Sequence, residues 1–357
     1  VTALPRPTAA PTLARDALRR AGIGVFLVGS STLLFQCAAC GARAPQAMAE
    51  PRHAPAPPPS DEPVVKGELK DDADVVRALR ESYTKYEHAI PMRDGVKLHT
   101  SVFAPKDRSR SYPILMIRTP YGVGPYGQDA YPNSGNKWVV RRLAPSAAFV
   151  KEGYILVHQD VRGKMMSEGT FVDVRPRAQK KGDADEATDA WDTIDWLVRE
   201  LPNNSGRVGV LGVSYRGWLA ALAGVDPHPA LKAISPQGLM ADTWMGDDFF
   251  HQGAFRQTQG VAYAAYIEGS GDLTLGAHDQ YEAYLKYPTL GQLARSTGID
   301  TIPSWVGFRE HPTFDAYWKA RALQRTLTHA RVPTLFVGGW WDQEDILGAQ
   351  LAYRTVE

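Results

Sequence analysis

A serine between two glycines is the first candidate for chemistry in this chain of 357 residues. Ser214 lies in the segment 212–217, after the apolar and glycine residues 208–211 and before the apolar run 218–223. A strand, a tight turn and a helix in that order are typical of a nucleophile elbow, which lifts a serine hydroxyl to the top of a parallel sheet. Arg216 stands where the usual G-x-S-x-G pattern has its second glycine, so the spacing alone leaves a plain strand-to-helix turn as an alternative.

The elements that must position this serine alternate along the chain. Apolar or alternating runs predict strands, and apolar residues at helical spacing predict helices between them. We therefore expect an α/β fold with a mostly parallel sheet covered on both faces. The expected strands are 97–104, 114–117, 154–157, 208–211, 231–234 and 334–337, and the expected helices are 71–86, 187–198 and 346–353.

Residues 242–330 break this alternation. Aromatic residues are dense there and no convincing strand is present, so the segment predicts a mainly helical insertion, a cap over the strand ends. An ordinary helical flank of the core is the alternative. Because the carboxyl ends of the strands carry the site in an α/β sheet, a cap there would shape the substrate pocket.

The composition is that of a globular protein. Hydrophobic residues make up 44% of the chain and charged residues 22%, and the net charge of +1 gives no argument for nucleic acid as a partner. Cys37 and Cys40 are the two cysteines, and without a second pair a metal or redox site is the less favoured interpretation. The first part of the segment 50–80 is rich in proline and alanine, which predicts a linker or N-terminal arm over these residues.

Residues 1–49 predict an export signal and hence a periplasmic or secreted protein. Three arginines within 15–20 precede the apolar stretch 21–35, and Ala47-Met48-Ala49 fits the small-x-small cleavage rule. A lipoprotein anchored at Cys40 is less favoured, and a retained membrane anchor is the other alternative.

Further stretches agree with the serine motif. Arg118-Thr-Pro-Tyr-Gly122 follows one expected strand, Trp244-Met-Gly-Asp-Asp248 follows another, and Gly339-Trp-Trp-Asp-Gln-Glu-Asp345 comes last. Together with the segment 212–217 they resemble the α-amino acid ester hydrolases, within the wider group of α/β-hydrolases that includes cocaine esterase and the X-Pro dipeptidyl peptidases. The likeness covers roughly residues 85–357.

The resemblance implies an α/β-hydrolase domain in two parts, 81–241 and 331–357, with the cap inserted between them. It also implies a carboxyl-terminal jelly-roll domain, missing from this sequence, and a catalytic histidine a few tens of residues after the catalytic acid. None of the nine histidines follows Asp342, the residue at the acid's position. We therefore expect an amino-terminal portion of a longer protein, with its base beyond Glu357.

Catalytic roles follow from the same resemblance. Ser214 becomes the nucleophile and Asp342 the acid that orients the histidine base, with a helix N-cap as the alternative for Asp342. The tetrahedral oxyanion needs donors, which are the backbone N–H of Tyr215 and the hydroxyl of Tyr121. A packed aromatic ring is the alternative for Tyr121.

Three acids are implied in specificity. In the amino-ester branch the equivalents of Asp248, Glu344 and Asp345 form a carboxylate cluster that holds the α-ammonium of the substrate. Carboxylates brought together raise each other's pKa and favour a cation. Solvated acids are the alternative, with Asp247 as good a member as Asp248, and a bound divalent cation is a minor one.

Two arginines need comment. Arg216 stands where the best-known amino-ester members carry glutamate, so it either weakens ammonium binding or pairs with a cap carboxylate. Arg162 and Asp160 follow an expected strand and predict a charged pair that braces a loop.

The function that this resemblance implies is a serine hydrolase that acts on esters or amides of α-amino acids, with no cofactor or metal. An acyl-enzyme forms on Ser214, and water or an amine such as a β-lactam nucleus takes the acyl group. We expect a homo-oligomer. Alternatives are an esterase, acylase or X-Pro dipeptidyl peptidase with other acyl substrates, or a non-catalytic binding fragment.

Overall fold

The structure is a computed structural model, and its description begins at residue 62. The predicted export signal, both cysteines and the start of the predicted arm therefore lie outside the described residues. Within the described part of the chain, no helix is long and apolar enough to cross a membrane. The described residues are 62–136, 140–141, 143–180, 182–269, 271, 273, 275, 279–329 and 331–356.

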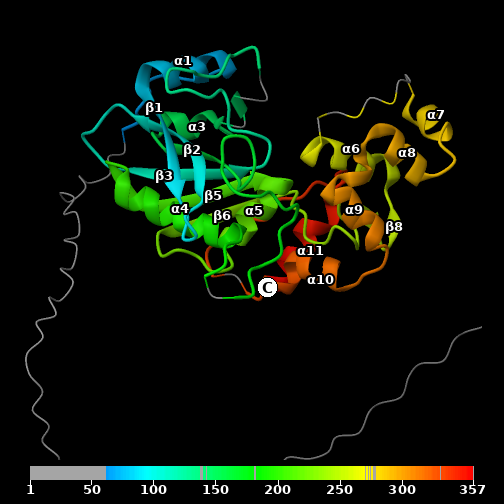
Figure 1. Cartoon of the computed structure of the whole chain (residues 1–357). Coiled ribbons are helices and arrows are strands. Elements are labelled where there is room, and N and C mark those ends of the chain that lie inside the picture. Colours follow the sequence, from blue (N-terminus) through cyan, green and yellow to red (C-terminus); the bar gives the residue numbers. More distant parts are fainter. Residues whose placement is uncertain are drawn as a thin grey trace, which may run out of the picture. The chain divides into compact units, whose positions relative to one another are not determined.

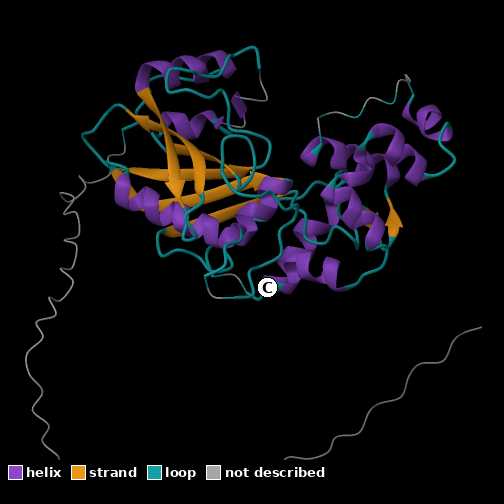
Figure 2. Ribbon diagram, viewed as in Figure 1, coloured by secondary structure: helices purple, strands orange, loops and turns teal. Residues whose placement is uncertain are grey.

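A six-stranded, mostly parallel sheet forms the core (Figures 1 and 2). The strands lie in the order β1-β2-β4-β3-β5-β6; β2 is antiparallel to β1 and β4, and the last four strands in this order are parallel. The chain passes from β3 to β4 on one side and then to β5 on the other, so the strand order reverses between β3 and β5. The strands are β1 (Tyr83–Pro91), β2 (Lys97–Pro105), β3 (Tyr112–Thr119), β4 (Ile155–Asp160), β5 (Asn204–Val213) and β6 (Leu231–Gln237).

The expected strand 334–337 is only partly formed. Thr334 and Val337 make isolated parallel bridges to Ile234 and Gln237 of β6, and the Gly238 amide donates to Val337 O at 2.7 Å. The segment therefore extends the sheet beyond β6 by single bridges rather than a continuous ladder. It still delivers the following loop to the carboxyl end of β6.

Helices cover the sheet on both faces, as expected. The helix α4 begins with a capping box in which the Asp185 side chain accepts from the Ala187 and Thr188 amides. The helices are α1 (Asp72–Ser82), α3 (Ala147–Lys151), α4 (Glu186–Glu200), α5 (Tyr215–Ala223) and α11 (Ile346–Val356).

Two boundaries near the start of the described chain differ from the predictions. The expected helix 71–86 ends at Ser82, because from Tyr83 onward the chain pairs with β2 along its whole length. Sheet pairing overrides the local helical pattern. The predicted arm, residues 50–80, also extends too far along the chain, because Val75 and Leu79 of α1 are buried against the sheet.

The segment after β6 contains short helices around a second hydrophobic core rich in aromatic rings. Contrary to the prediction of no strand, β7 (Phe250–His251) and β8 (Ala254–Phe255) form a small hairpin. Phe250 pairs with Phe255 there, and their rings lie 5.1 Å apart. The helical elements are α6 (Gln257–Glu268), α7 (Gln280–Leu285), α8 (Leu290–Thr297), η1 (Ile299–Thr301), α9 (Pro303–Glu310), α10 (Ala316–Arg321) and η2 (Leu323–Arg325).

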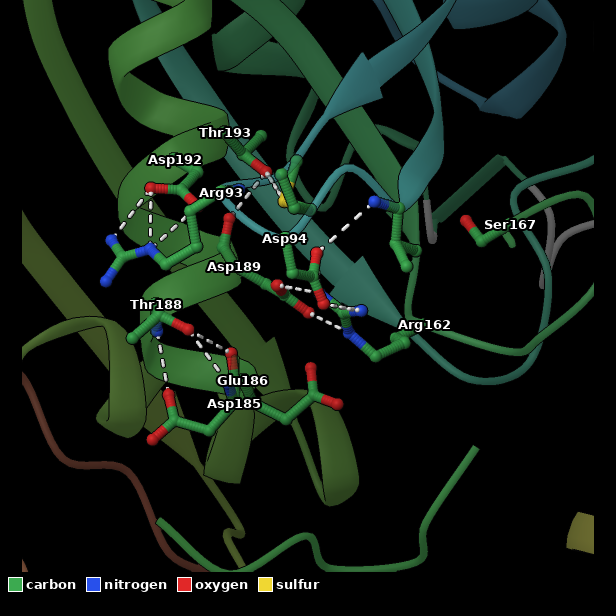
Figure 3. A network of polar contacts seen from close by, with 12 residues as sticks. Arg93, Asp94, Arg162, Ser167, Asp185, Glu186, Thr188, Asp189, Asp192 and Thr193 are labelled. Carbon is green, nitrogen blue, oxygen red and sulfur yellow. Dashed lines mark hydrogen bonds and ion pairs between the residues drawn. The ribbon is translucent and has the colours of Figure 1, made fainter. Parts of the chain in front are cut away.

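A buried polar network fixes the loop after β4 to the start of α4 (Figure 3). Arg162 donates to Asp94 and to Asp189, each at 2.7 Å. The predicted pair of Arg162 with Asp160 is therefore wrong, although Arg162 does brace the loop. Asp160 instead accepts from the Tyr126 hydroxyl at 3.0 Å. Two acids already surround the Arg162 guanidinium, so Asp160 is left to fix the loop after β3.

Candidate active site

Ser214 lies at a sharp turn between β5 and α5. Its backbone has φ 61° and ψ −128°, a strained conformation for a residue with a side chain. The Ser214 amide donates to Gln237 O at the end of β6, at 2.9 Å. A Cβ on Gly212 would collide with the carbonyl of Arg216, which explains the glycine before the serine. The geometry is that of a nucleophile elbow.

The late second glycine has a structural reason. A Cβ on Gly217 would lie 2.6 Å from Gln237 O, so a glycine at this position lets α5 approach β6. Arg216 occupies the usual glycine position, and its side chain lines a small cavity with Thr119 and residues 122–125. The imperfect motif therefore still closes the turn.

The two tyrosines predicted to donate to the oxyanion follow different strands. Tyr215 is the first residue of α5, and an amide at that position has no carbonyl acceptor within its helix. Tyr121 follows β3, and its ring lies 6.3 Å from that of Tyr215 and 5.9 Å from that of Tyr266 in α6. Burial, followed by the nearby Asp248 charge, raises the pKa of Tyr121, so its hydroxyl keeps its proton and remains a donor.

Asp342 follows the segment that bridges to β6. Its Oδ1 accepts from the amides of Glu344 at 3.1 Å and Asp345 at 3.0 Å. A Cβ on Gly238 would lie 3.0 Å from its Oδ2, which places this carboxylate beside the end of β6. One oxygen thus stabilises the turn before α11, while the other faces the sheet edge that also holds the Ser214 amide.

Two of the predicted specificity acids meet in a buried pair. The Asp248 side chain is 3% exposed and that of Asp345 is 2% exposed. The two carboxyl groups hydrogen-bond to each other, and the Asp248 amide donates to Glu344 O at 2.8 Å. Burial and then the Asp248 charge raise the pKa of Asp345, while burial raises that of Asp248, with Glu344 adding to the effect. The structure therefore brings Asp248, Glu344 and Asp345 together.

Asp247, the alternative member, has a different role. Its Oδ2 accepts from the Ala241 amide at 2.9 Å and the Asp242 amide at 3.0 Å, which fixes the turn that leaves β6. Burial raises its pKa to about 6 despite these donors. Within the described chain, no group of three His, Cys, Asp or Glu side chains is arranged to hold a metal ion.

Sequence reasoning missed Asp173, in the loop after β4. It is 9% exposed, and the Tyr263 hydroxyl from α6 donates to its Oδ1 at 2.7 Å. Burial raises the pKa of Asp173 to about 7. The charge of Asp173 also acts on Tyr121 and Tyr215, so it lies near the predicted oxyanion donors. It belongs to none of the motifs, and no spacing signal could have identified it.

The histidine base has no counterpart in the described part of the chain. No imidazole there hydrogen-bonds to Ser214 or Asp342. His251, in the segment 242–330, is exposed on β7.

A parallel sheet with a strained serine elbow beside its reversal of strand order defines an α/β-hydrolase fold. Residues 94–357 match the family of X-Pro dipeptidyl-peptidases (S15 family), and the chain belongs to this family.

Similar proteins of known name include both esterases and a peptidase. Cocaine esterase of Rhodococcus sp. (strain MB1 Bresler) is 30% identical over 71% of this chain and 43% of its own length. A solved α-amino acid ester hydrolase labelled with selenomethionine is 39% identical, with a TM-score of 0.68 over 81% of this chain and 47% of that chain. An aminopeptidase from a marine sediment Thaumarchaeota archaeon is 36% identical, with a TM-score of 0.67 over 83% of this chain and 48% of that chain. The chain thus spans slightly under half the length of each.

Proposed function

We propose that the natural protein is a serine hydrolase that acts on esters or amides of α-amino acids through an acyl-enzyme on Ser214. The observation that carries this proposal is the buried pair of Asp248 and Asp345 beside Glu344. Buried carboxylates are costly unless a cation or donors compensate them. The α-ammonium group of an amino acid is a cation of suitable size.

The proposed reaction begins with attack of Ser214 Oγ on the carbonyl carbon. A histidine base takes the hydroxyl proton, and Asp342 orients that histidine. The Tyr215 amide and the Tyr121 hydroxyl donate to the oxyanion. The carbonyl re-forms as the bond to the alcohol or amine breaks, and the histidine protonates the leaving group.

The acyl-enzyme is then attacked by water, which gives the free amino acid. An amine can attack instead and form a new amide, and the amine of a β-lactam nucleus is the acceptor that we propose to test. In both reactions the substrate ammonium stays on the acid cluster. A substrate without it leaves buried acids unpaired, which is a strong basis for rejection.

The test compares two substrates on the full-length natural protein. Phenylglycine methyl ester should be hydrolysed much faster, by kcat/KM, than the same ester without its α-amino group. This preference should be lost when Glu344 or Asp248 is replaced by alanine. Asp226→Ala is a matched control, because Asp226 is an exposed acid paired with Arg177 near the far end of β6. Equal rates for the two esters in the unmodified protein would contradict the proposal.

The second candidate is an esterase, acylase or X-Pro dipeptidyl peptidase that acts on other acyl groups. Membership of the S15 family and the similarity to cocaine esterase favour it. Faster hydrolysis of the neutral ester, or cleavage after an X-Pro dipeptide, would select this function. Binding of these substrates without any turnover would instead indicate a non-catalytic protein.

A further inference from the structure

A buried lysine in β1 lies at the centre of four oxygen atoms. Lys85 is 3% exposed, and its Nζ donates to Glu87 Oε1 at 3.0 Å. Its other contacts are the backbone carbonyls of Pro125 at 2.5 Å, Gly127 at 2.9 Å and Ala130 at 3.1 Å. An ammonium has three N–H donors, so this environment uses all of them. Such saturation is what makes a buried charge tolerable.

The acceptors show what the lysine holds. Three of the four belong to one irregular segment, residues 125–130, which follows β3. Glu87 adds to the attachment because its Oε1 also accepts from the Gly127 amide at 2.7 Å. Within the segment, the Ala130 amide donates to Gly127 O at 3.0 Å. The segment is thus bound to β1 through both its carbonyl and its amide groups.

Only residues 122–124 separate this segment from Tyr121. Tyr126 lies between two of the lysine-bound carbonyls, and its hydroxyl donates to Asp160 Oδ2 at 3.0 Å and accepts from the Val123 amide at 3.4 Å. On the other side, the Tyr121 amide donates to Thr119 Oγ1 at 3.1 Å. The chain around Tyr121 is therefore held by β3 before it and by the Lys85 and Asp160 contacts after it.

We propose that Lys85 is a positioning residue for the oxyanion site, and that its ammonium fixes residues 122–130 so that the Tyr121 hydroxyl faces the reacting carbonyl. This inference rests on the proposed role of Tyr121. Lys85 itself touches neither Ser214 nor the acid cluster. Its removal leaves three carbonyls and one carboxylate without their common donor, and the segment must rearrange to reach water.

The experiment reads the position of Tyr121 directly. Position 121 of the full-length protein is labelled with 3-fluorotyrosine, and its ¹⁹F spectrum is recorded for Lys85→Met and Lys106→Met. Lys106 is the matched control, because it is exposed and donates to the Arg80 and Glu81 carbonyls at 2.9 and 2.8 Å, which cap α1. Lys85→Met should shift or broaden the signal, whereas Lys106→Met should leave it unchanged.

Kinetics give the second measurement. In unlabelled protein, Lys85→Met should lower kcat for phenylglycine methyl ester about 100-fold, the effect of roughly 1 Å of misplacement, with KM within about twofold. Lys106→Met should change neither constant more than about twofold. Lys85→Ala should regain part of its kcat with ethylammonium, which can fill the vacated site, but not with tetramethylammonium, which has no N–H donor.

The outcomes separate this inference from the proposed function. An unchanged ¹⁹F signal in Lys85→Met overturns it, whatever the activity. A changed signal with unchanged kcat also overturns it, because the segment would then be irrelevant to the reaction. If the unmodified protein has no activity, the proposed function fails while the ¹⁹F comparison still decides whether Lys85 positions Tyr121. If Lys85→Met does not fold, Lys85→Gln keeps two donors and serves in both measurements.

Discussion

The carboxyl groups of Asp248 and Asp345 share a hydrogen bond, although one follows β6 and the other precedes α11. Two carboxylates cannot bond in this way unless one carries a proton. Within the described chain, no N–H or O–H group donates to Asp248 Oδ2 or Asp345 Oδ1, so the shared proton is their partner. The two acids titrate as one coupled pair, and we expect the shared proton to reside on Asp345 and the charge on Asp248, because the contact between them raises the pKa of Asp345 and lowers that of Asp248.

This asymmetry predicts different effects of two similar substitutions. Asp345→Asn replaces a protonated acid by an amide that can also donate to Asp248, so KM for phenylglycine methyl ester should rise less than about fivefold. On the proposed function, Asp248→Asn removes the charge that would face the substrate ammonium, so KM should rise about 100-fold, the usual cost of losing one partner of a buried charge pair. Steady-state kinetics on both variants measure the difference.

The neutral ester is the control for that comparison. Its KM should be the same in both variants, because it has no ammonium to lose. Equal losses for Asp345→Asn and Asp248→Asn with the amino ester would show that the charge is not located on Asp248.

The sequence predicted the parts of this site that lie in continuous motifs. Ser214, Tyr215 and Asp342 each follow a strand whose apolar run is readable, and such ends meet at one edge of a parallel sheet. The sequence could not show that Asp248 reaches Asp345 while Asp247 turns towards the Ala241 and Asp242 amides. That arrangement depends on the positive φ of 49° at Asp248, which the neighbouring residues in the sequence do not predict.

A second prediction concerns the oxyanion. Tyr121→Phe removes one hydroxyl donor and should lower kcat for phenylglycine methyl ester by about 100- to 1000-fold, with little change in KM, because the donor acts mainly in the transition state. Tyr266→Phe is the matched control, since the Tyr266 ring packs against Tyr121 but its side chain is 47% exposed. A kcat unchanged by Tyr121→Phe would remove this tyrosine from the mechanism.

A third prediction tests the late glycine of the elbow. Gly217→Ala places a methyl group 2.6 Å from Gln237 O, so α5 must move away from β6 and the free energy of unfolding should fall by about 2 kcal/mol or more. Gly291→Ala is the control in α8, where the nearest atom would be 3.5 Å away. It should be neutral or stabilise by up to about 1 kcal/mol. Urea unfolding of both variants measures the contrast, and equal effects would refute the packing argument.

Other features were beyond the reach of the sequence because their partners are distant along the chain. Lys85 reads as an ordinary strand residue, and its carbonyl acceptors carry no side-chain signal. Arg162 was expected to pair with Asp160, its nearest acid in sequence. The fold instead brings Asp94 and Asp189 to it (Figure 3). Asp173 is likewise recognised only through the Tyr263 hydroxyl that reaches it from α6.

Asp173 leads to a prediction about stability and pH. Burial raises its pKa to about 7 in the folded state, whereas an unfolded aspartate titrates near 3.9. The folded protein therefore binds this proton more tightly, so the stability contribution is complete below about pH 4 and is lost as the pH rises through about 7. Asp173→Asn stays neutral at every pH and keeps an oxygen for the Tyr263 hydroxyl. The free energy of unfolding of this variant, relative to that of the unmodified protein, should therefore increase by up to about 1.4 kcal/mol per pH unit between pH 4 and 7.

Urea unfolding at several pH values checks this, with Asp94→Asn as a control of opposite sign. Burial opposes ionisation of Asp94, but its hydrogen bond to Arg162 holds the pKa below the usual value. The contribution of Asp94 is therefore present above about pH 4 and is lost as the pH falls further. A difference between Asp173→Asn and the unmodified protein that stays constant from pH 4 to 7 would mean that Asp173 is ionised throughout. Its contact with Tyr263 would then be a charged hydrogen bond that joins the loop after β4 to α6.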